Sequence, residues 1–387
     1  MARPVEIRQV STAGELRSFI RFPWSIYRNP ESGQSYDQWV PPLIVDEKAT
    51  LDPRKNPFFE HAEADHFMAF RDGRPVGRIS AIVDHDFNEY QNAETGFFGF
   101  FESIDDQAVA DSLLERVEQW VGDRSLKSLL GPANPSMNHI IGLLASAFDL
   151  PPVVQMGYNP PYYPRLLEEY GLEKRKDLYS YRQVAESGTS EKMRRVSDLA
   201  QKRYGIRLET IDLKQLDSIV EMIRQIYNDA WSGNWGFVPW TEAEFRHLAD
   251  DLKLIVIPEL CVLAYVGDEA VGFCLPIPDI NQVLRTMNGR LFPFGIFTLL
   301  ANRRKIDFVR IAAMGVKKAH QNKGIDALMV RYIVEHSPEN GIVGGDLSWI
   351  LEENLPLRNM LEAWGATHYK THRMYGKDLD ERASRSG

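Results

Sequence analysis

The sequence predicts a mixed α/β (or α+β) protein made of two tandem copies of one fold, each copy a mixed sheet flanked by helices. The chain has 387 residues, enough for two to three domains at about 150 residues each. Its hydrophobic content of 44% and charged content of 26% are ordinary for a globular protein. The third observation is that the two halves resemble each other, as the following elements show.

The clearest repeated element is a hairpin. Residues 67–77 contain an apolar strand, an Asp-Gly turn and a second strand, and residues 262–272 repeat this order with a Gly-Asp turn. Two apolar runs joined by a short Gly-containing turn are typical of a β-hairpin. Each half is therefore expected to contain this hairpin at the same place.

The elements around the hairpin also repeat. A strand and an apolar-periodic helix precede it, over residues 5–27 and again over 206–227. Further strands and helices follow, so each half is expected to follow the order β-α-β-β-β-α-β-α-β. A polar, helix-prone linker ends at Gly205. We therefore place one domain at 1–187 and a second at 188–387, with a linker helix at 188–205.

Composition excludes several classes of protein. The net charge is −9 and no basic tract occurs, which argues against a nucleic-acid partner. The first residues carry charges, and no apolar run approaches the ~20 residues of a membrane span, so a cytoplasmic protein is expected. Cys261 and Cys274 form no metal or redox motif. Asp84-His85-Asp86 follows a predicted hairpin strand, where alternation sends neighbouring side chains to opposite faces, so the three are not expected to converge and no metal is expected.

The strongest chemical signal lies in the second half. Residues 308–316 form a predicted buried strand, a polar turn containing Lys323 and Gly324 follows, and an apolar helix comes next. A helix start presents unpaired N–H groups and a positive dipole end, which suit a diphosphate. A turn with a purely structural role is equally compatible with this pattern.

This arrangement resembles the GNAT superfamily of acyl-CoA N-acyltransferases. The superfamily's diphosphate loop has the pattern Gln/Arg-x-x-Gly-x-Gly/Ala, which Gln321-x-x-Gly324-x-Asp326 matches except at the last position. A carboxylate there opposes a diphosphate unless its side chain turns outward as a helix cap. The resemblance implies that acyl-CoA or acetyl-CoA is the donor and that the following residues bind it: Met314, Gly315, Val316, Gln321, Asn322, Lys323, Gly324, Ile325, Asp326 and, on the pantetheine arm, Asn354.

The resemblance also defines the expected chemistry. Backbone N–H groups of Met314–Val316 are expected to stabilise the oxyanion. Many members use a Tyr to protonate the leaving thiolate, but Leu361 stands at that position, so another group or solvent must replace it. Asp346 and Glu352 are expected near the cleft end of their strand and are candidate bases for the amine. A salt-bridged strand end explains either carboxylate equally well.

The first half departs further from the family pattern. Residues 102–107 replace its diphosphate loop with a sequence that has three carboxylates and no Gly, so we expect no CoA binding there. Two turn-rich stretches, 131–138 and 158–163, offer amides and aromatic rings instead. The candidate substrate contacts are Asn134, Asn138, Tyr158, Asn159, Tyr162 and Tyr163. A loop shape set by Pro and aromatic packing is the alternative.

A narrower resemblance concerns the substrate. The patterns at 159–163, 235–239 and 349–352 are similar to a bacterial tandem subfamily related to bacterial ceramide synthases, which acylate a sphingoid amine. Residues 291–301 are apolar, contain Phe294 and Phe297, and precede three basic residues. They are expected to line an acyl tunnel or to rest at a membrane interface; packing between domains is the alternative.

The sequence therefore predicts an acyl-CoA-dependent N-acyltransferase that acts on a primary amine, either a small molecule or a lipid or sphingoid amine. An inactive tandem scaffold is the alternative, because the family Tyr is missing and Asp326 departs from the loop pattern. A Nudix-type hydrolase is a third reading, suggested by Arg358-x-x-x-Glu362, but the paired carboxylates of its metal site are absent. Peripheral membrane contact is compatible with the prediction, and the sequence predicts no oligomeric state.

Overall fold

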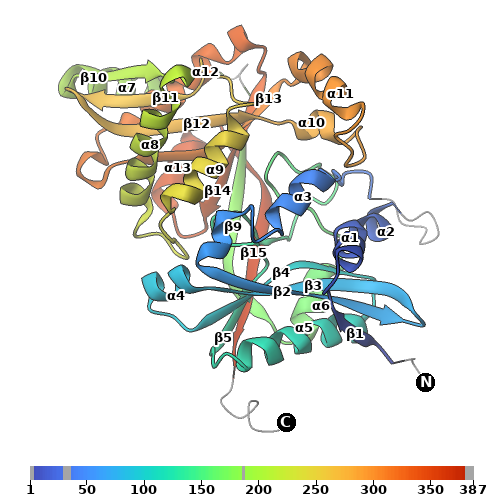
Figure 1. Cartoon of the computed structure of the whole chain (residues 1–387). Helices are drawn as coiled ribbons and strands as arrows, with labels where there is room; N and C mark the ends of the chain where they lie inside the picture. Colours follow the sequence, from blue (N-terminus) through green and yellow to red (C-terminus); the bar gives the residue numbers. More distant parts are fainter. Residues whose placement is uncertain (1–3, 29–35, 185–187, 380–387) are drawn as a thin grey trace. The chain divides into compact units, whose positions relative to one another are not determined.

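The computed structural model describes residues 4–28, 36–184 and 188–379 (Figure 1). The chain divides into two compact units, which we call unit 1 and unit 2. Unit 1 holds residues 1–178, 284–295 and 371–387, and unit 2 holds residues 179–283 and 296–370. The expected boundary at 187/188 falls beside residues 185–187, outside the described residues, so the domain limits stay a prediction.

Unit 1 is built on the strand order β1-β2-β3-β4-β5, in which neighbours are antiparallel except β4 and β5. Its strands are β1 (Glu6–Gln9), β2 (Ala62–Arg71), β3 (Arg74–Asp84), β4 (Thr95–Ser103), β5 (Ser128–Gly131), β6 (Ala133–Asn134), β7 (Ile140–Ile141), β8 (Leu143–Leu144) and the first part of β9 (Glu173–Val184). Its helices are α1 (Ala13–Arg21), α2 (Pro23–Tyr27), α3 (Ile44–Thr50), α4 (His85–Gln91), α5 (Gln107–Gly122) and α6 (Tyr163–Glu169).

Unit 2 repeats this order as β10-β11-β12-β13-β14, again with one parallel pair, β13 and β14. Its strands are β10 (Ile206–Thr210), β11 (Val262–Val266), β12 (Glu269–Pro278), β13 (Phe308–Val316), β14 (Gly344–Leu351) and the first part of β15 (Thr367–Asp378). Its helices are α7 (Glu191–Tyr204), α8 (Leu216–Trp231), α9 (Glu242–Leu252), α10 (Asn281–Leu284), α11 (Gly295–Asn302), α12 (Ile325–His336) and α13 (Leu355–Ala363). The last residue of α10, Leu284, and the first residue of α11, Gly295, belong to unit 1.

Both predicted hairpins are present, as β2–β3 and β11–β12. Their turns contain Gly73 (φ 72°) and Gly267 (φ 61°), a backbone conformation that favours glycine. The last part of β15 belongs to unit 1, where Tyr375 pairs with Gly131 of β5. The expected fold class, two copies of a mixed sheet flanked by helices, is confirmed.

Helices cover both faces of each sheet. In unit 1, Phe67 packs in the cluster that contains α5, whereas its neighbour Met68 packs with α1. In unit 2, a Cβ built on Gly272 faces Ile325 of α12, and one built on Gly315 faces Ala230 of α8. Successive side chains of a strand point to opposite faces, so these contacts place α5 and α12 on one face of their sheets and α1 and α8 on the other. No helix among the described residues is long and apolar enough to cross a membrane.

In unit 1 the chain itself covers β4 beyond its parallel neighbour. The pairing of β4 with β5 ends at Phe97 opposite Leu130, although β4 continues to Ser103. Beyond this point β6 packs against β4, and a Cβ built on Gly99 would lie 1.9 Å from the carbonyl oxygen of Ala133. This contact supports the expectation that the first half does not hold a CoA arm beside β4.

Gly99→Ala should therefore destabilise the protein, by about 1–3 kcal/mol, because a backbone oxygen cannot move aside as a side chain does. Denaturant unfolding measures the change. Gly122→Ala is the matched control, since a Cβ built on Gly122, in α5, meets nothing within 4 Å and should be neutral or stabilising. Equal stability of wild type and Gly99→Ala would show that β6 does not pack on β4.

Candidate active site

The two parallel strands of unit 2 separate towards their carboxyl ends. β13 and β14 pair from Phe308 opposite Gly344 to Ile311 opposite Leu347. β13 then continues to Val316 and β14 to Leu351, while β13 stays paired with β12. Backbone groups that lose a strand partner need another partner, so the gap suits an extended ligand that carries amide groups.

Met314, Gly315 and Val316 lie at the open end of β13, beyond the last pair with β14. The carbonyl of Met314 accepts a hydrogen bond of 3.1 Å from Nε1 of Trp231, the last residue of α8. This contact anchors α8 beside the strand end. The structure thus places the three residues where the strands separate, and their contact with an oxyanion stays a prediction.

The loop after β13 turns into α12 through two left-handed residues, Asn322 (φ 59°) and Gly324 (φ 76°). The first N–H groups of a helix have no carbonyl partner inside it and carry the positive end of the dipole. Within the described part of the chain, no side chain caps α12 at Gly324. The start of α12 can therefore accept an anion such as a diphosphate.

Gly324 also has a structural reason to be glycine. A Cβ added to it would lie 3.0 Å from Cβ of Ala200 and 3.2 Å from Cγ1 of Val196, both on α7. Its positive φ adds a second reason, because side chains disfavour that conformation. The packing of α7 thus fixes the loop whether or not a ligand binds there.

The other loop residues are held by local contacts. Gln321 Nε2 donates to the carbonyl of Val316 at 3.2 Å, and Lys323 Nζ donates to that of Ala319 at 2.8 Å. Asp326 Oδ1 accepts from the Ala327 N–H at 2.9 Å, so its carboxylate is turned to its own helix. Ile325 is buried, which leaves only its backbone for a ligand.

Asp346 lies in the paired part of β14, opposite Arg310 of β13, and not at the end of its strand as the sequence suggested. It is fully buried and accepts hydrogen bonds from Ser348 Oγ and, at 2.7 Å, from Tyr369 Oη. Burial raises the pKa of Asp346, while these hydrogen bonds and the Arg310 charge oppose the rise. The carboxylate therefore accepts a proton more readily than an exposed one.

Arg310 completes this buried cluster. Its Nε donates to Ser348 Oγ at 3.1 Å, and its Cζ lies 5.0 Å from the centre of the Trp349 ring. Burial lowers the pKa of Arg310, and the nearby Asp346 carboxylate opposes that shift. Sequence analysis missed Arg310 and Tyr369. The available signal was Arg310 itself, a charged residue within an otherwise apolar strand.

Glu352 follows the last residue of β14 and is half-buried. Its carbonyl accepts a hydrogen bond of 2.6 Å from Nη1 of Arg358. Asn354 opens α13, as expected, and its side chain accepts from the Leu357 N–H at 3.3 Å. Glu352 is thus the nearer of the two candidate bases to the open end of the strand, and both roles stay predictions.

Arg358 and Glu362, which suggested a Nudix-type hydrolase, have a structural role. Arg358 Nε donates to Tyr181 Oη at 3.1 Å, and Tyr181 Oη donates to Glu362 at 3.0 Å. The three side chains hold α13 against β9. Leu361, at the position of the family Tyr, is fully buried.

In unit 1, several candidate substrate residues are engaged inside the fold. Asn159 is buried and bonds the backbone of Leu144 through Oδ1 (2.6 Å) and Nδ2 (3.2 Å). Tyr163 is buried and donates to Glu102 at 2.6 Å. Asn134 Oδ1 accepts from the Phe100 N–H at 2.5 Å. Direct substrate contact by Asn159 and Tyr163 is not supported, because the structure covers both side chains.

The remaining three are half-buried. Tyr158 Oη donates to the carbonyl of Phe148 at 2.9 Å, and Tyr162 Oη to that of Ser103 at 2.8 Å. The N–H of Asn138 donates to Ser136 Oγ at 3.2 Å. The expected substrate contacts of Tyr158, Tyr162 and Asn138 stay predictions.

Glu102 is a residue that sequence analysis assigned to a repelling loop. It lies instead within β4 and accepts hydrogen bonds from Tyr27 (2.9 Å) and Tyr163 (2.6 Å). Burial raises its pKa to about 7, although the Arg78 charge 3.8 Å away and the two hydroxyls oppose the rise. A lone carboxylate after an aromatic strand gave no sequence signal for this burial.

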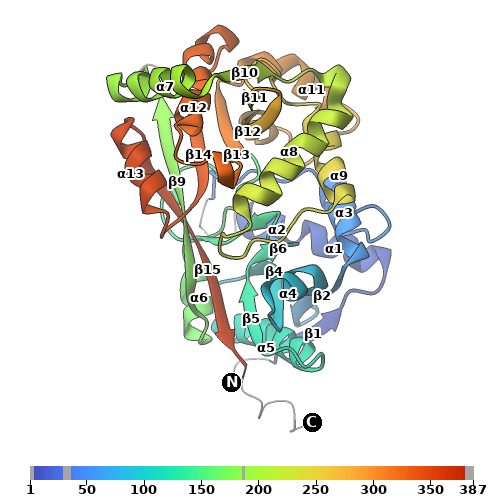
Figure 2. The same cartoon turned by 90° about the vertical axis from the view of Figure 1, so that its left-hand side faces the viewer.

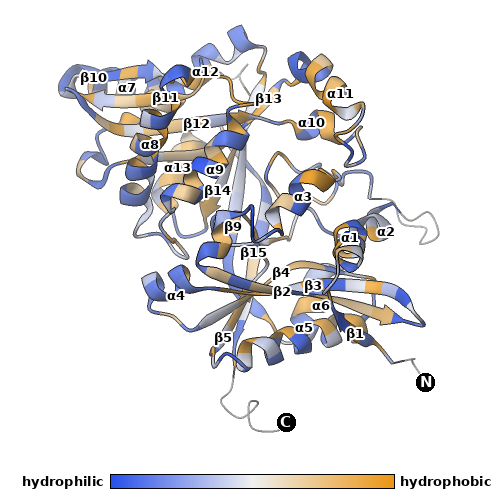
Figure 3. Cartoon of the chain, in the orientation of Figure 1, coloured by the Kyte–Doolittle hydropathy of each residue, from blue (hydrophilic) through white to orange (hydrophobic). Residues whose placement is uncertain are grey.

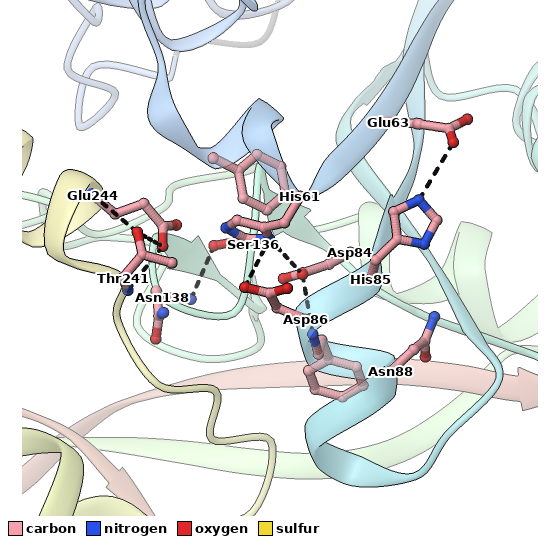
Figure 4. Close-up of polar contacts among 12 residues, drawn as sticks. His61, Glu63, Asp84, His85, Asp86, Asn88, Ser136, Asn138, Thr241 and Glu244 are labelled. Atoms are coloured by element: carbon pink, nitrogen blue, oxygen red, sulfur yellow. Dashed lines mark hydrogen bonds and ion pairs between the residues drawn. The ribbon is translucent and has the colours of Figure 1, made fainter.

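Asp84 and Asp86 meet a histidine that the sequence did not connect to them (Figure 4). His61 Nδ1 lies 3.1 Å from Asp84 Oδ1 and 3.7 Å from Asp86 Oδ2, whereas His85 contacts Glu63 at 3.3 Å. Asp84 also caps α4. No group of three metal-ligating side chains suited to an ion occurs among the described residues.

The apolar segment before β13 forms α11, which Figure 3 colours as hydrophobic. Two of its large apolar side chains are exposed, Phe297 at 66% and Leu300 at 62%, as is Phe294 just before the helix at 76%. An enclosed acyl tunnel lined by Phe294 and Phe297 is therefore not what the structure shows. Their contact with a substrate stays a prediction.

Comparison with known proteins agrees with this geometry. The sequence profile of the Acetyltransferase (GNAT) family matches residues 220–366, which span most of unit 2. A protein of Caulobacter vibrioides named bacterial ceramide synthase is 35% identical over 383 residues, covering 96% of each chain. Protein YghO of Escherichia coli is 32% identical over 381 residues, covering 96% of this chain and 95% of that one.

Solved structures with little sequence identity share the fold. A tandem GNAT protein from the clavulanic acid biosynthesis pathway has a TM-score of 0.54 at 10% identity, covering 97% of this chain and 98% of its own. An N-acetyltransferase of Sphaerobacter thermophilus has a TM-score of 0.53 at 12% identity, covering 97% of both chains. The chain therefore belongs to the GNAT superfamily of N-acyltransferases, in a tandem-domain group related to bacterial ceramide synthase.

Proposed function

We propose that unit 2 binds a CoA thioester and transfers its acyl group to a primary amine, and that the acyl group is long and the amine belongs to a lipid. The observation that carries the first part is the separation of β13 from β14 next to the uncapped start of α12. A pantetheine arm fits the gap between the strands, and the diphosphate fits the helix start. The name of the Caulobacter relative supports the lipid amine.

The reaction joins the amine nitrogen to the thioester carbonyl carbon and releases CoA as a thiol. N–H groups at Met314–Val316 stabilise the oxyanion of the intermediate. The amine gives up its proton to a carboxylate, either Glu352 beside the gap or Asp346 through bound water. Leu361 has no proton to give, so another group or water protonates the leaving thiolate.

Two substitutions in the loop should change CoA affinity in opposite directions. Gly324→Trp should abolish binding measured by calorimetry, because its side chain fills the space beside the helix start. Asp326→Gly should tighten binding about two- to fivefold, because it removes a negative charge near the diphosphate. Gly341→Trp is the control, since Gly341 has the same left-handed backbone (φ 74°) in open space. Unchanged binding in Gly324→Trp at intact stability would rule out this site.

The base is identified by pH–rate profiles of kcat/KM for Asp346→Asn and Glu352→Gln. A base must be ionised, so activity rises with pH through its pKa, and burial moves that rise to higher pH if Asp346 is the base. The variant that lacks the base should have a kcat/KM about 10²- to 10⁴-fold lower than wild type. Its kcat/KM should also no longer rise with pH on the acid side of the profile. A limb that survives in both variants would exclude both carboxylates.

Exposed apolar residues support the long acyl group. Phe297 and Leu300 of α11 are followed by Arg303, Arg304 and Lys305, all exposed. Each buried CH₂ of an acyl chain contributes about 0.8 kcal/mol, so even partial contact favours long donors strongly. The same combination of apolar and basic side chains suits an anionic membrane surface, from which a lipid amine would come.

We expect palmitoyl-CoA to bind much more tightly than acetyl-CoA, by calorimetry below the micelle concentration. Phe297→Asp, like Phe294→Asp, should remove most of this preference and reduce sedimentation with phosphatidylglycerol vesicles, without changing the affinity for free CoA. Val343→Asp changes an apolar residue that is 53% exposed elsewhere in unit 2 and should have neither effect. Equal affinity for the two esters in the wild type would contradict the long-donor proposal.

A further inference from the structure

Helix α7 packs along α12, and Figure 2 shows the two side by side. The inner face of α7 is buried at Met193, Ser197 and Ala200. Its exposed face is rich in basic side chains, although the whole chain carries a net charge of −9. Packing explains the inner face of α7, and on its exposed face Asp198 pairs with Arg331 of α12.

One edge of that exposed face borders the loop at the start of α12. Val196 and Ala200 are the residues nearest to Gly324. Val196 is 39% exposed and Leu199 is 58% exposed. Residues three and seven positions apart share one side of a helix, so Val196, Leu199 and Arg203 form a single strip next to the loop.

Two cations lie near one aromatic ring at the end of this strip. The Arg203 Cζ lies 5.4 Å from the centre of the Tyr204 ring, and Lys323 Nζ lies 5.8 Å from the same centre. Neither pairs with a carboxylate in the part of the chain that the structure describes. An anion that binds beside this ring is attracted by both positive charges.

We propose that this strip binds the 3′-phosphoadenosine part of the CoA donor, with the 3′-phosphate on Arg203 and Lys323 and the adenine on Val196 and Leu199. The inference rests on the proposed donor site, because the diphosphate at α12 brings the nucleotide to α7. The 3′-phosphate is carried by the same ribose whose 5′ oxygen bears the diphosphate, so it lies within reach of nearby side chains. A guanidinium is well suited to a phosphate monoester.

The test compares CoA with 3′-dephospho-CoA by calorimetry on the full chain. Wild type should bind CoA about 10- to 100-fold more tightly, the range expected for hydrogen bonds to charged groups. In Arg203→Glu the affinity for CoA should fall to the affinity for 3′-dephospho-CoA, while the affinity for 3′-dephospho-CoA should stay unchanged. Arg203→Lys should keep part of the preference for CoA over 3′-dephospho-CoA. Higher salt should reduce the preference in the wild type.

Arg194→Glu is the matched control, because it makes the same charge change on α7. Arg194 lies one turn before Asp198, which pairs with Arg331 on the other side of the helix, so the preference for CoA should survive. Thermal unfolding of each variant checks that α7 still packs. Equal wild-type affinity for the two ligands, or an equal loss in Arg203→Glu and Arg194→Glu, overturns this inference alone. Binding of neither ligand overturns the donor site itself.

Discussion

The pairing of β13 with β14 ends at Ile311 opposite Leu347, and the candidate site of unit 2 depends on that separation. A strand edge with unpaired N–H and C=O groups is costly unless something satisfies it. β12 pairs with one edge of β13 as far as Val316, while the edge that faces β14 has no strand pairing beyond Ile311. The loop that follows β13 leads to the start of α12, so the position of β13 determines both the gap between the strands and the position of the helix start.

Unit 1 shows what happens when the protein satisfies such an edge with its own chain. β4 continues beyond its last pair with β5, which ends at Gly131, and β6 packs on β4 at Gly99. The side chain of Asn134 accepts the Phe100 N–H, so this backbone donor is satisfied by the protein itself. Two copies of one fold thus differ in whether this edge is occupied, and the copy with the occupied edge has also lost the glycine of the loop.

The repeat, both hairpins and the loop before α12 were predictable, because each has a local signal: an apolar period, an Asp-Gly turn, or a Gly before a helix. The burial of Asp346 and of Glu102 was not predictable from the sequence, because it depends on partners that are distant in sequence, such as Tyr369 and Tyr27. Phe294 illustrates the opposite error. An apolar run predicts burial, yet 76% of this side chain is exposed.

The net charge of −9 does not conflict with a donor that carries several phosphates. At physiological ionic strength exposed charges act over about 8 Å, so a ligand responds to the residues beside it and not to the total. Several acidic side chains of unit 2 are neutralised locally, as in the pairs Glu269–Lys317 and Asp198–Arg331. Asp326 is turned to its own helix backbone. The charges nearest the helix start are therefore those of Lys323, the helix dipole and, opposing them, Asp326.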